Sequence, residues 1–97
     1  MKNIFIINVN YKTSLEEIEK NLASHREYLK IGYEKGILLA SGPQNPKTGG
    51  IIIGIFNNIN EAKEFSLNDP FIKNNLAESS IIEFNPILHC KEIQNKI

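Results

Sequence analysis

The chain has 97 residues, of which 41% are hydrophobic and 23% are charged, and this is the length and composition of one ordinary globular domain. Its 11 Lys and Arg residues balance 11 Asp and Glu residues, so nucleic acid and anionic membranes are poor candidate partners, because both attract proteins with a basic excess. The chain has a single cysteine, and no apolar run approaches the ~20 residues that cross a bilayer, so we expect a cytoplasmic protein. No Cys and His residues have the spacing of zinc ligands, and we expect no metal or other cofactor.

The first two predicted elements are a strand and a long helix. Residues 3–10 are rich in Ile, Phe and Val and have the length of a strand. A helix follows, because Ser14 with Glu17 makes a capping box at its start and Gly36 is placed for a left-handed C-cap at its end. Its apolar face is formed by residues that recur at helical spacing, namely Leu15, Ile18, Leu22, Leu29 and Tyr33.

A short strand, a loop and a third strand come next. Residues 37–40 have the apolar character of a strand. The segment SGPQNPKTGG, residues 41–50, contains two prolines and three glycines, which predict a loop with several fixed turns. Residues 51–56 are almost continuously apolar and form the third predicted strand.

The last predicted elements are a second helix and a fourth strand. Asn58 or Asn60 caps the helix, and Pro70 ends or redirects it. Residues 80–88 supply the strand, in which Pro86 indicates an edge position or a bulge.

The element order βαββαβ predicts an α+β, ferredoxin-like domain over residues 1–89, with both helices on one face of a four-stranded antiparallel sheet. Residues 90–97 are left as a polar tail. The first and third strands are apolar at nearly every position, although a sheet covered on one face normally alternates apolar and polar residues. We therefore expect a homodimer through the sheet face, a dimeric α/β barrel. The alternative is isoleucine enriched on a half-exposed sheet, and the apolar area favours the dimer.

His25 is the first candidate for chemistry. It lies three residues after Leu22 and four before Leu29, so it belongs to the apolar face of the first helix and faces the sheet. A histidine in that position is either a general acid or base, or a hydrogen-bonded and inert residue at the edge of the apolar stripe.

Asp69 is the natural partner of His25. It lies seven residues after Ala62, on the sheet-facing side of the second helix. The structural alternative is strong, because Asp69 followed by Pro70 is also a good N-cap and first-turn pair for a short helix. From these residues alone, the cap is the favoured role.

The segment 41–50 supplies a third candidate. Glycines such as Gly42 let backbone amides approach a ligand, Ser41 offers a hydroxyl, and Lys47 with Arg26 could hold a carboxylate or a phosphate. The spacings of a Walker A loop, a dinucleotide fingerprint and a hydrolase nucleophile elbow are absent. A hairpin connection that binds no ligand explains the same residues about equally well.

Three features in this order resemble the YciI-like (YCII-related) family: His25 with Arg26, the segment SGPQNPKTGG, and NDPF at residues 68–71. The resemblance runs from the first strand to the fourth. It implies a ferredoxin-like fold that dimerises into an α/β barrel, and an active site that pairs His25 with Asp69.

The resemblance also implies that Ser41, Gly42 and Pro43 line the same cleft. Many family members carry an arginine three residues before the histidine, whereas this chain has Leu22 there, so Arg26 is a candidate substitute. The activities suggested for the family are of lyase or isomerase type on small, often cyclic, molecules.

Three functional hypotheses follow. In the first, an enzyme uses His25 as general base or acid, Asp69 to fix its tautomer or raise its basicity, and loop amides around Ser41 to Pro43 to stabilise negative charge that develops on a small substrate, which could be anionic. In the second, the same cleft binds a ligand without turnover. The third is a structural dimerisation domain, which predicts no pocket that joins His25 and Asp69.

Overall fold

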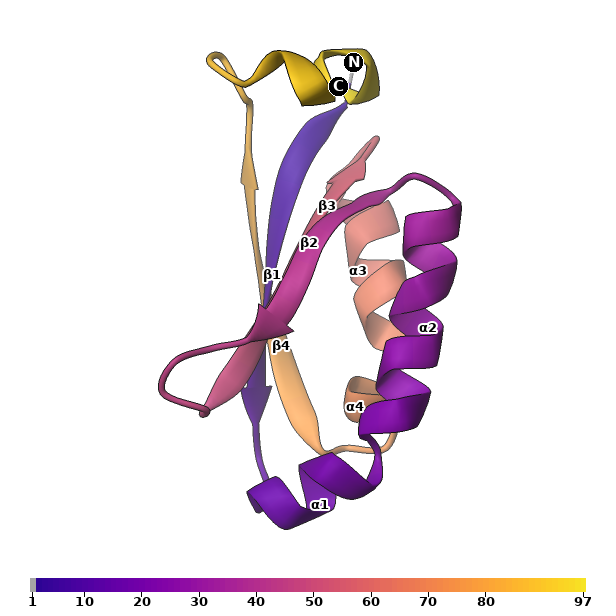
Figure 1. Cartoon of the computed structure of the whole chain (residues 1–97), viewed down its shortest axis with the longest axis vertical. Coiled ribbons are helices and arrows are strands. Elements are labelled where there is room, and N and C mark those ends of the chain that lie inside the picture. The colour runs from indigo at the N-terminus through magenta and orange to yellow at the C-terminus, as the bar shows by residue number, and fades with distance from the viewer. Residues whose placement is uncertain (1) are drawn as a thin grey trace.

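A computed structural model describes residues 2–97 as an α+β domain. In chain order its elements are β1 (Asn3–Tyr11), α1 (Leu15–Lys20), α2 (Leu22–Glu34), β2 (Leu38–Pro43), β3 (Gly49–Phe56), α3 (Ile59–Leu67), α4 (Pro70–Lys73), β4 (Ala77–Phe84) and the 3-10 helix η1 (Lys91–Lys96). The strands form one antiparallel sheet in the order β2-β3-β1-β4. Helices α2 and α3 lie side by side on one face of this sheet (Figure 1). The predicted ferredoxin-like fold is confirmed.

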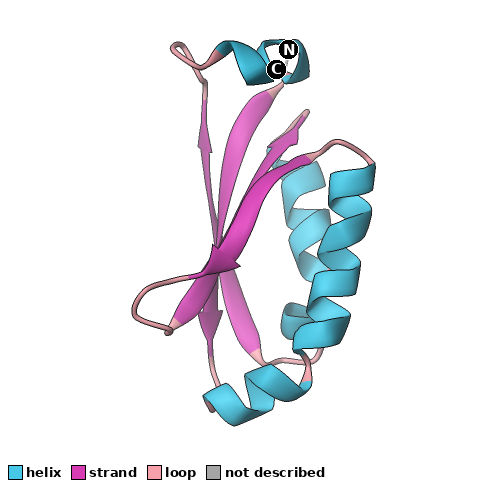
Figure 2. Cartoon of the chain, in the orientation of Figure 1, coloured by secondary structure: helices cyan, strands magenta, loops and turns pink. Residues whose placement is uncertain are grey.

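The first predicted helix is in fact two helices that meet at Asn21. Ser14 caps α1 by accepting a hydrogen bond from the Glu17 amide at 3.2 Å, as predicted, but the Glu17 side chain pairs with Lys20. Asn21 ends α1 because its side chain donates to the Glu17 carbonyl at 2.9 Å and so competes with the helix backbone. As a result, α1 lies across the end of α2 (Figure 2).

The predicted loop 41–50 is shorter in the structure. β2 continues through Pro43 and β3 already begins at Gly49, because the two strands pair from Leu38↔Gly54 to Pro43↔Gly50. Gly49 is required by close packing, since a Cβ atom there would run into the carbonyl oxygen of Val9 on β1.

The fourth strand was also misplaced by the prediction. It covers Ala77–Phe84 and not residues 80–88, because its pairing with β1 runs from Tyr11↔Ala77 to Ile4↔Phe84 and stops where β1 starts. Pro86 therefore follows the strand. The strand does lie at an edge of the sheet, as predicted.

The core lies between the sheet and the helices. The fully buried side chains of β1, Phe5 and Ile7, alternate with residues of the other face, as the pleat requires. Phe5 packs edge-to-face on Phe56 with ring centroids 5.6 Å apart. Burial of this face fixes the sheet register and, with it, the positions of the strand ends that approach the helices.

The face of the sheet away from the helices is more apolar in one half than in the other. There Ile6 pairs with Ile53 and Ile82, and Ile82 and Phe84 are 56% and 42% exposed. The other half carries Asn8, which pairs with Ser80 on one side and with Ile51 on the other. The apolar surface expected on this face is therefore concentrated at the end where β1 starts and β4 stops.

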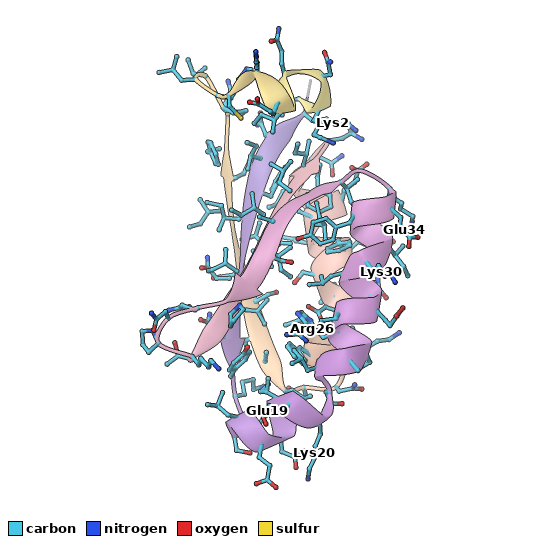
Figure 3. The ribbon with its side chains drawn as sticks, in the orientation of Figure 1. Lys2, Glu19, Lys20, Arg26, Lys30 and Glu34 are labelled. Atoms are coloured by element: carbon cyan, nitrogen blue, oxygen red, sulfur yellow. The ribbon has the colours of Figure 1, made fainter. Side chains whose placement is uncertain are left out.

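The segment after β4 forms the helix η1 next to the start of the chain. Side chains of this segment, such as Gln94 and Ile97, line a shallow hollow together with Lys2, which Figure 3 labels. The preceding Ile87 and Leu88 are 77% and 93% exposed.

Candidate functional site

A cavity of about 320 Å³ lies between the helices and the sheet, at the end where α1 crosses under α2. It brings together six residues that the sequence singled out, which are His25, Arg26, Ser41, Gly42, Pro43 and Lys47. The seventh, Asp69, does not line the cavity but contacts the His25 side chain. These seven residues come from four parts of the chain that only the tertiary fold joins.

His25 lies on α2 with its ring between Asp69 and the cavity. Its Nδ1 atom is 2.8 Å from Oδ1 of Asp69, and the two side chains are 13% and 1% exposed. The imidazole stacks on Phe71 with ring centroids 4.0 Å apart and an interplanar angle of 5°. The ring is thus held by one hydrogen bond and one stacked neighbour, which fixes its orientation.

Asp69 is both an N-cap and the partner of His25. Its Oδ1 atom accepts the backbone N–H of Phe71 at 3.0 Å, which caps α4, and the same atom meets His25. Within residues 2–97 its second oxygen, Oδ2, is buried and has no hydrogen-bond partner. The two roles that the sequence offered as alternatives are therefore filled together.

The hydrogen bond sets the tautomer of His25. Because Oδ1 of Asp69 is an acceptor, the proton of the neutral imidazole is assigned to Nδ1, and Nε2 keeps its lone pair. Since Nδ1 is committed to Asp69, Nε2 is the nitrogen that His25 can offer to a molecule in the cavity.

Two tyrosines lie close to this pair. The Tyr28 hydroxyl donates to the Phe65 carbonyl at 2.7 Å, and burial, followed by the negative charge of Asp69, raises the pKa of Tyr28 to about 12. The same two causes, in the same order, raise the pKa of Tyr11. Both phenols therefore stay neutral at ordinary pH.

Tyr11 also lines the cavity, and the sequence reading missed it. It follows Phe5, Ile7 and Val9 at alternate positions of β1, so the period of the strand could have placed it on the helix-facing side. Its ring packs edge-to-face on Phe71, 6.0 Å between centroids.

Three ionic side chains line the cavity: Glu19 from α1, Arg26 from α2 and Lys47 from the turn between β2 and β3. Figure 3 shows Arg26 on the sheet side of α2, whereas Lys30 and Glu34 point away on the outer side. In the ion pairs of residues 2–97 none of the three takes part. Glu19 was not predicted, although it lies four residues after Leu15 and so on the apolar stripe.

Residues 41–43 belong to the edge strand β2 and not to the predicted loop. The Ser41 hydroxyl is 2.7 Å from the Tyr33 hydroxyl, a contact that ties β2 to α2 beside the cavity. A Cβ atom on Gly42 would meet nothing within 4 Å, so close packing in this chain does not require a glycine there. Pro43 has no N–H to donate.

One wall of the cavity is apolar. Leu22, which stands where many members of the resembling family have an arginine, lines it together with Leu15, Ile18 and Leu29. Leu22 therefore offers no ionic contact at this wall of the cavity.

Over residues 2–97, no three His, Cys, Asp or Glu side chains gather in a way that could hold a metal ion. Among the helices of the same residues, none has the length and the apolar character needed to cross a bilayer.

Comparison with known proteins identifies the family and a structural neighbour. A family model described as the YCII-related domain matches residues 3–85. A solved structure of 5-chloro-2-hydroxyhydroquinone dehydrochlorinase from Burkholderia phenoliruptrix AC1100, in complex with 2,5-dihydroxybenzoquinone, is similar with a TM-score of 0.73 and 25% sequence identity. The similarity covers 92% of this chain and 97% of that chain. No curated protein matches the chain.

Proposed function

This chain belongs to the YCII-related domain family, and on that basis we propose that it is a small-molecule enzyme of lyase or isomerase type whose acid-base chemistry depends on His25 and Asp69. The observation that carries the proposal is the 2.8 Å contact between His25 Nδ1 and Asp69 Oδ1 at the wall of a cavity. A family neighbour that is a dehydrochlorinase supports a reaction of the elimination class.

The proposed chemical step is a proton transfer. His25 Nε2 takes a proton from an O–H or C–H group of the substrate, and the released electron pair forms a new double bond. In an elimination a leaving group then departs with its own bonding pair, and in an isomerisation the proton returns to a different atom. Asp69 acts as a positioning partner, because its carboxylate orients the ring and stabilises the imidazolium.

The proposed substrate is a small anionic molecule. The cavity volume of about 320 Å³ is at the low end of the ~300–1,000 Å³ of small-molecule sites, which suits a single ring. Arg26 and Lys47 are the cations that would contact the anion, while Ser41, Gly42 and Pro43 form the wall opposite α2.

We further propose that the protein is a cytoplasmic homodimer, built from domains of residues 1–89. The exposed Ile82 and Phe84 on the free sheet face support a C2 interface there, because monomers rarely leave contiguous apolar strands in water. Cys90, a free and exposed thiol, fits a reducing compartment.

The experiment compares turnover in wild type and two histidine variants. Chlorinated and unchlorinated hydroxyhydroquinones are incubated with each protein, and products and released chloride are measured. His25→Gln should lower turnover by a factor of ~10²–10⁴, the usual contribution of a general base. The matched control is His89→Gln, since His89 is exposed and lies outside the cavity.

Two outcomes would contradict the proposal. Unchanged turnover in His25→Gln would remove His25 from the chemistry. A ligand that raises the melting temperature and is recovered unaltered after prolonged incubation would identify a binding module without turnover.

A further inference from the structure

We infer that the cavity selects monoanions with a compact apolar body, such as single-ring monocarboxylates, and that Glu19 is the residue that rejects dianions. This inference deepens the proposed function and relies on it only for the location of the substrate site. It goes further by naming the charge and the shape of the molecule, and by giving a role to a side chain outside the His25–Asp69 pair.

The apolar body follows from the cavity wall. Leu15, Ile18, Leu22 and Leu29 come from α1 and α2, and the Phe71 ring closes the space beside His25. A hydrophobic ring that binds there moves from water to a surface of aliphatic and aromatic carbon, and this transfer is favourable. A polar or multiply charged body would lose its hydration at this wall without gaining hydrogen bonds.

The single charge follows from the ionic groups of the cavity. Arg26 and Lys47 contribute two positive charges and Glu19 one negative charge, and none of the three is paired with another protein group in the described chain. Asp69 is no counter-charge for a ligand, because it is 1% exposed and hydrogen-bonded to His25 and to the Phe71 amide. One carboxylate on the ligand therefore balances the net charge at the cavity.

The negative charge and the two positive charges of the cavity come from different elements. Arg26 comes from α2 and Lys47 from the turn after β2, whereas Glu19 comes from α1. Figure 3 labels Arg26 and Glu19 on their two helices. A second carboxylate on a ligand held by the two cations would approach the exposed side chain of Glu19 at the cavity, where like charges repel. Glu19 thus discriminates by repulsion, which is a common route to specificity.

The test measures binding and not turnover. Benzoate, benzamide and benzene-1,4-dicarboxylate serve as probes with one, no and two negative charges on a similar ring, and dissociation constants are measured by titration calorimetry or NMR. Wild type should bind benzoate ~10-fold more tightly than either of the other two probes. Arg26→Gln and Lys47→Gln should each weaken benzoate binding several-fold, while Lys30→Gln, on the outer side of α2, should not.

The decisive variant is Glu19→Gln. It should strengthen binding of the dicarboxylate ~10-fold and leave benzamide unchanged. Glu16→Gln is the matched control, because it removes the same charge from the same helix at a residue that does not line the cavity.

The inference is overturned if benzamide binds as tightly as benzoate, if benzoate does not bind, or if Glu16→Gln and Glu19→Gln act alike. Each of these results is independent of the proposed function, which depends on turnover and on His25. Loss of turnover in His25→Gln together with equal binding of all three probes would keep the enzyme and reject the charge filter.

Discussion

One carboxylate oxygen of Asp69 contacts His25 and also caps the start of α4. Oδ1 of Asp69 meets His25 Nδ1 at 2.8 Å and accepts the Phe71 amide at 3.0 Å. The residue that orients the imidazole therefore also starts α4. A substitution that removes this oxygen affects stability and chemistry together, and only a variant that keeps it can separate the two.

Asp69→Asn should provide that separation. The amide oxygen can still cap α4, so the free energy of unfolding should stay within ~1 kcal/mol of wild type. The charge that stabilises an imidazolium is lost, and turnover should fall by a factor of ~10² or more. Asp69→Ala should lose turnover and, in addition, the ~0.5–2 kcal/mol of the cap. Urea unfolding and initial rates measure both effects, and wild-type turnover in Asp69→Asn would contradict the positioning role.

Tyr28→Phe should change the alkaline limit of stability. The folded protein raises the pKa of Tyr28 from 10.0 to about 12, so it holds the phenol proton more tightly than the unfolded chain does. That contribution is complete below pH 10 and is lost as the pH rises from 10 to about 12.

Urea unfolding at a series of pH values measures this effect. The Tyr28→Phe variant should be less stable by ~1 kcal/mol at pH 8, because the hydrogen bond to the Phe65 carbonyl is gone. The difference from wild type should shrink above pH 10. A difference that stays constant up to pH 12 would show that burial does not hold this proton.

Two glycines of the β2–β3 hairpin should respond differently to alanine. Gly49→Ala places a Cβ against the Val9 carbonyl and should cost ~2 kcal/mol or more, because neither backbone can move without breaking the ladder. Gly42→Ala meets nothing and should be neutral or stabilising by ~0.5 kcal/mol. Melting temperatures decide between them, and equal shifts would contradict the packing argument.

The dimer should depend on the apolar half of the free sheet face. Ile82→Glu and Phe84→Glu each place a charge in the proposed interface and should convert the dimer to monomer in sedimentation velocity runs. Leu67→Glu is the control, since Leu67 is also exposed, at 63%, but lies on α3, on the helical side of the sheet. A wild-type protein that sediments as a monomer at high concentration would overturn the proposal.

Local chemistry made much of the fold predictable from the sequence. Ser14, Asn58 and Asp69 cap helices in the structure, and Gly36 adopts a positive φ of 74° at the end of α2. Each of these signals acts within a few residues, so sequence reading recovers it. The same locality explains why His25 could be assigned to the apolar side of its helix.

Features that depend on distant partners were not predictable in the same way. The length of β2 is set by its pairing with β3, and the end of β4 by the start of β1. The break between α1 and α2 depends on the hydrogen bond that the Asn21 side chain donates to the Glu17 carbonyl. Likewise, Glu19 lines the cavity because α1 lies across the end of α2.

The break at Asn21 places part of the cavity wall on a separate helix, α1. Leu15, Ile18 and Glu19 reach the cavity from a six-residue helix that carries neither member of the His25–Asp69 pair. Sequence changes in that short segment can thus alter the cavity wall while the contact between His25 and Asp69 stays in place. Under the proposed function, proteins that keep the His25–Asp69 pair can therefore differ in substrate specificity through changes in α1 alone.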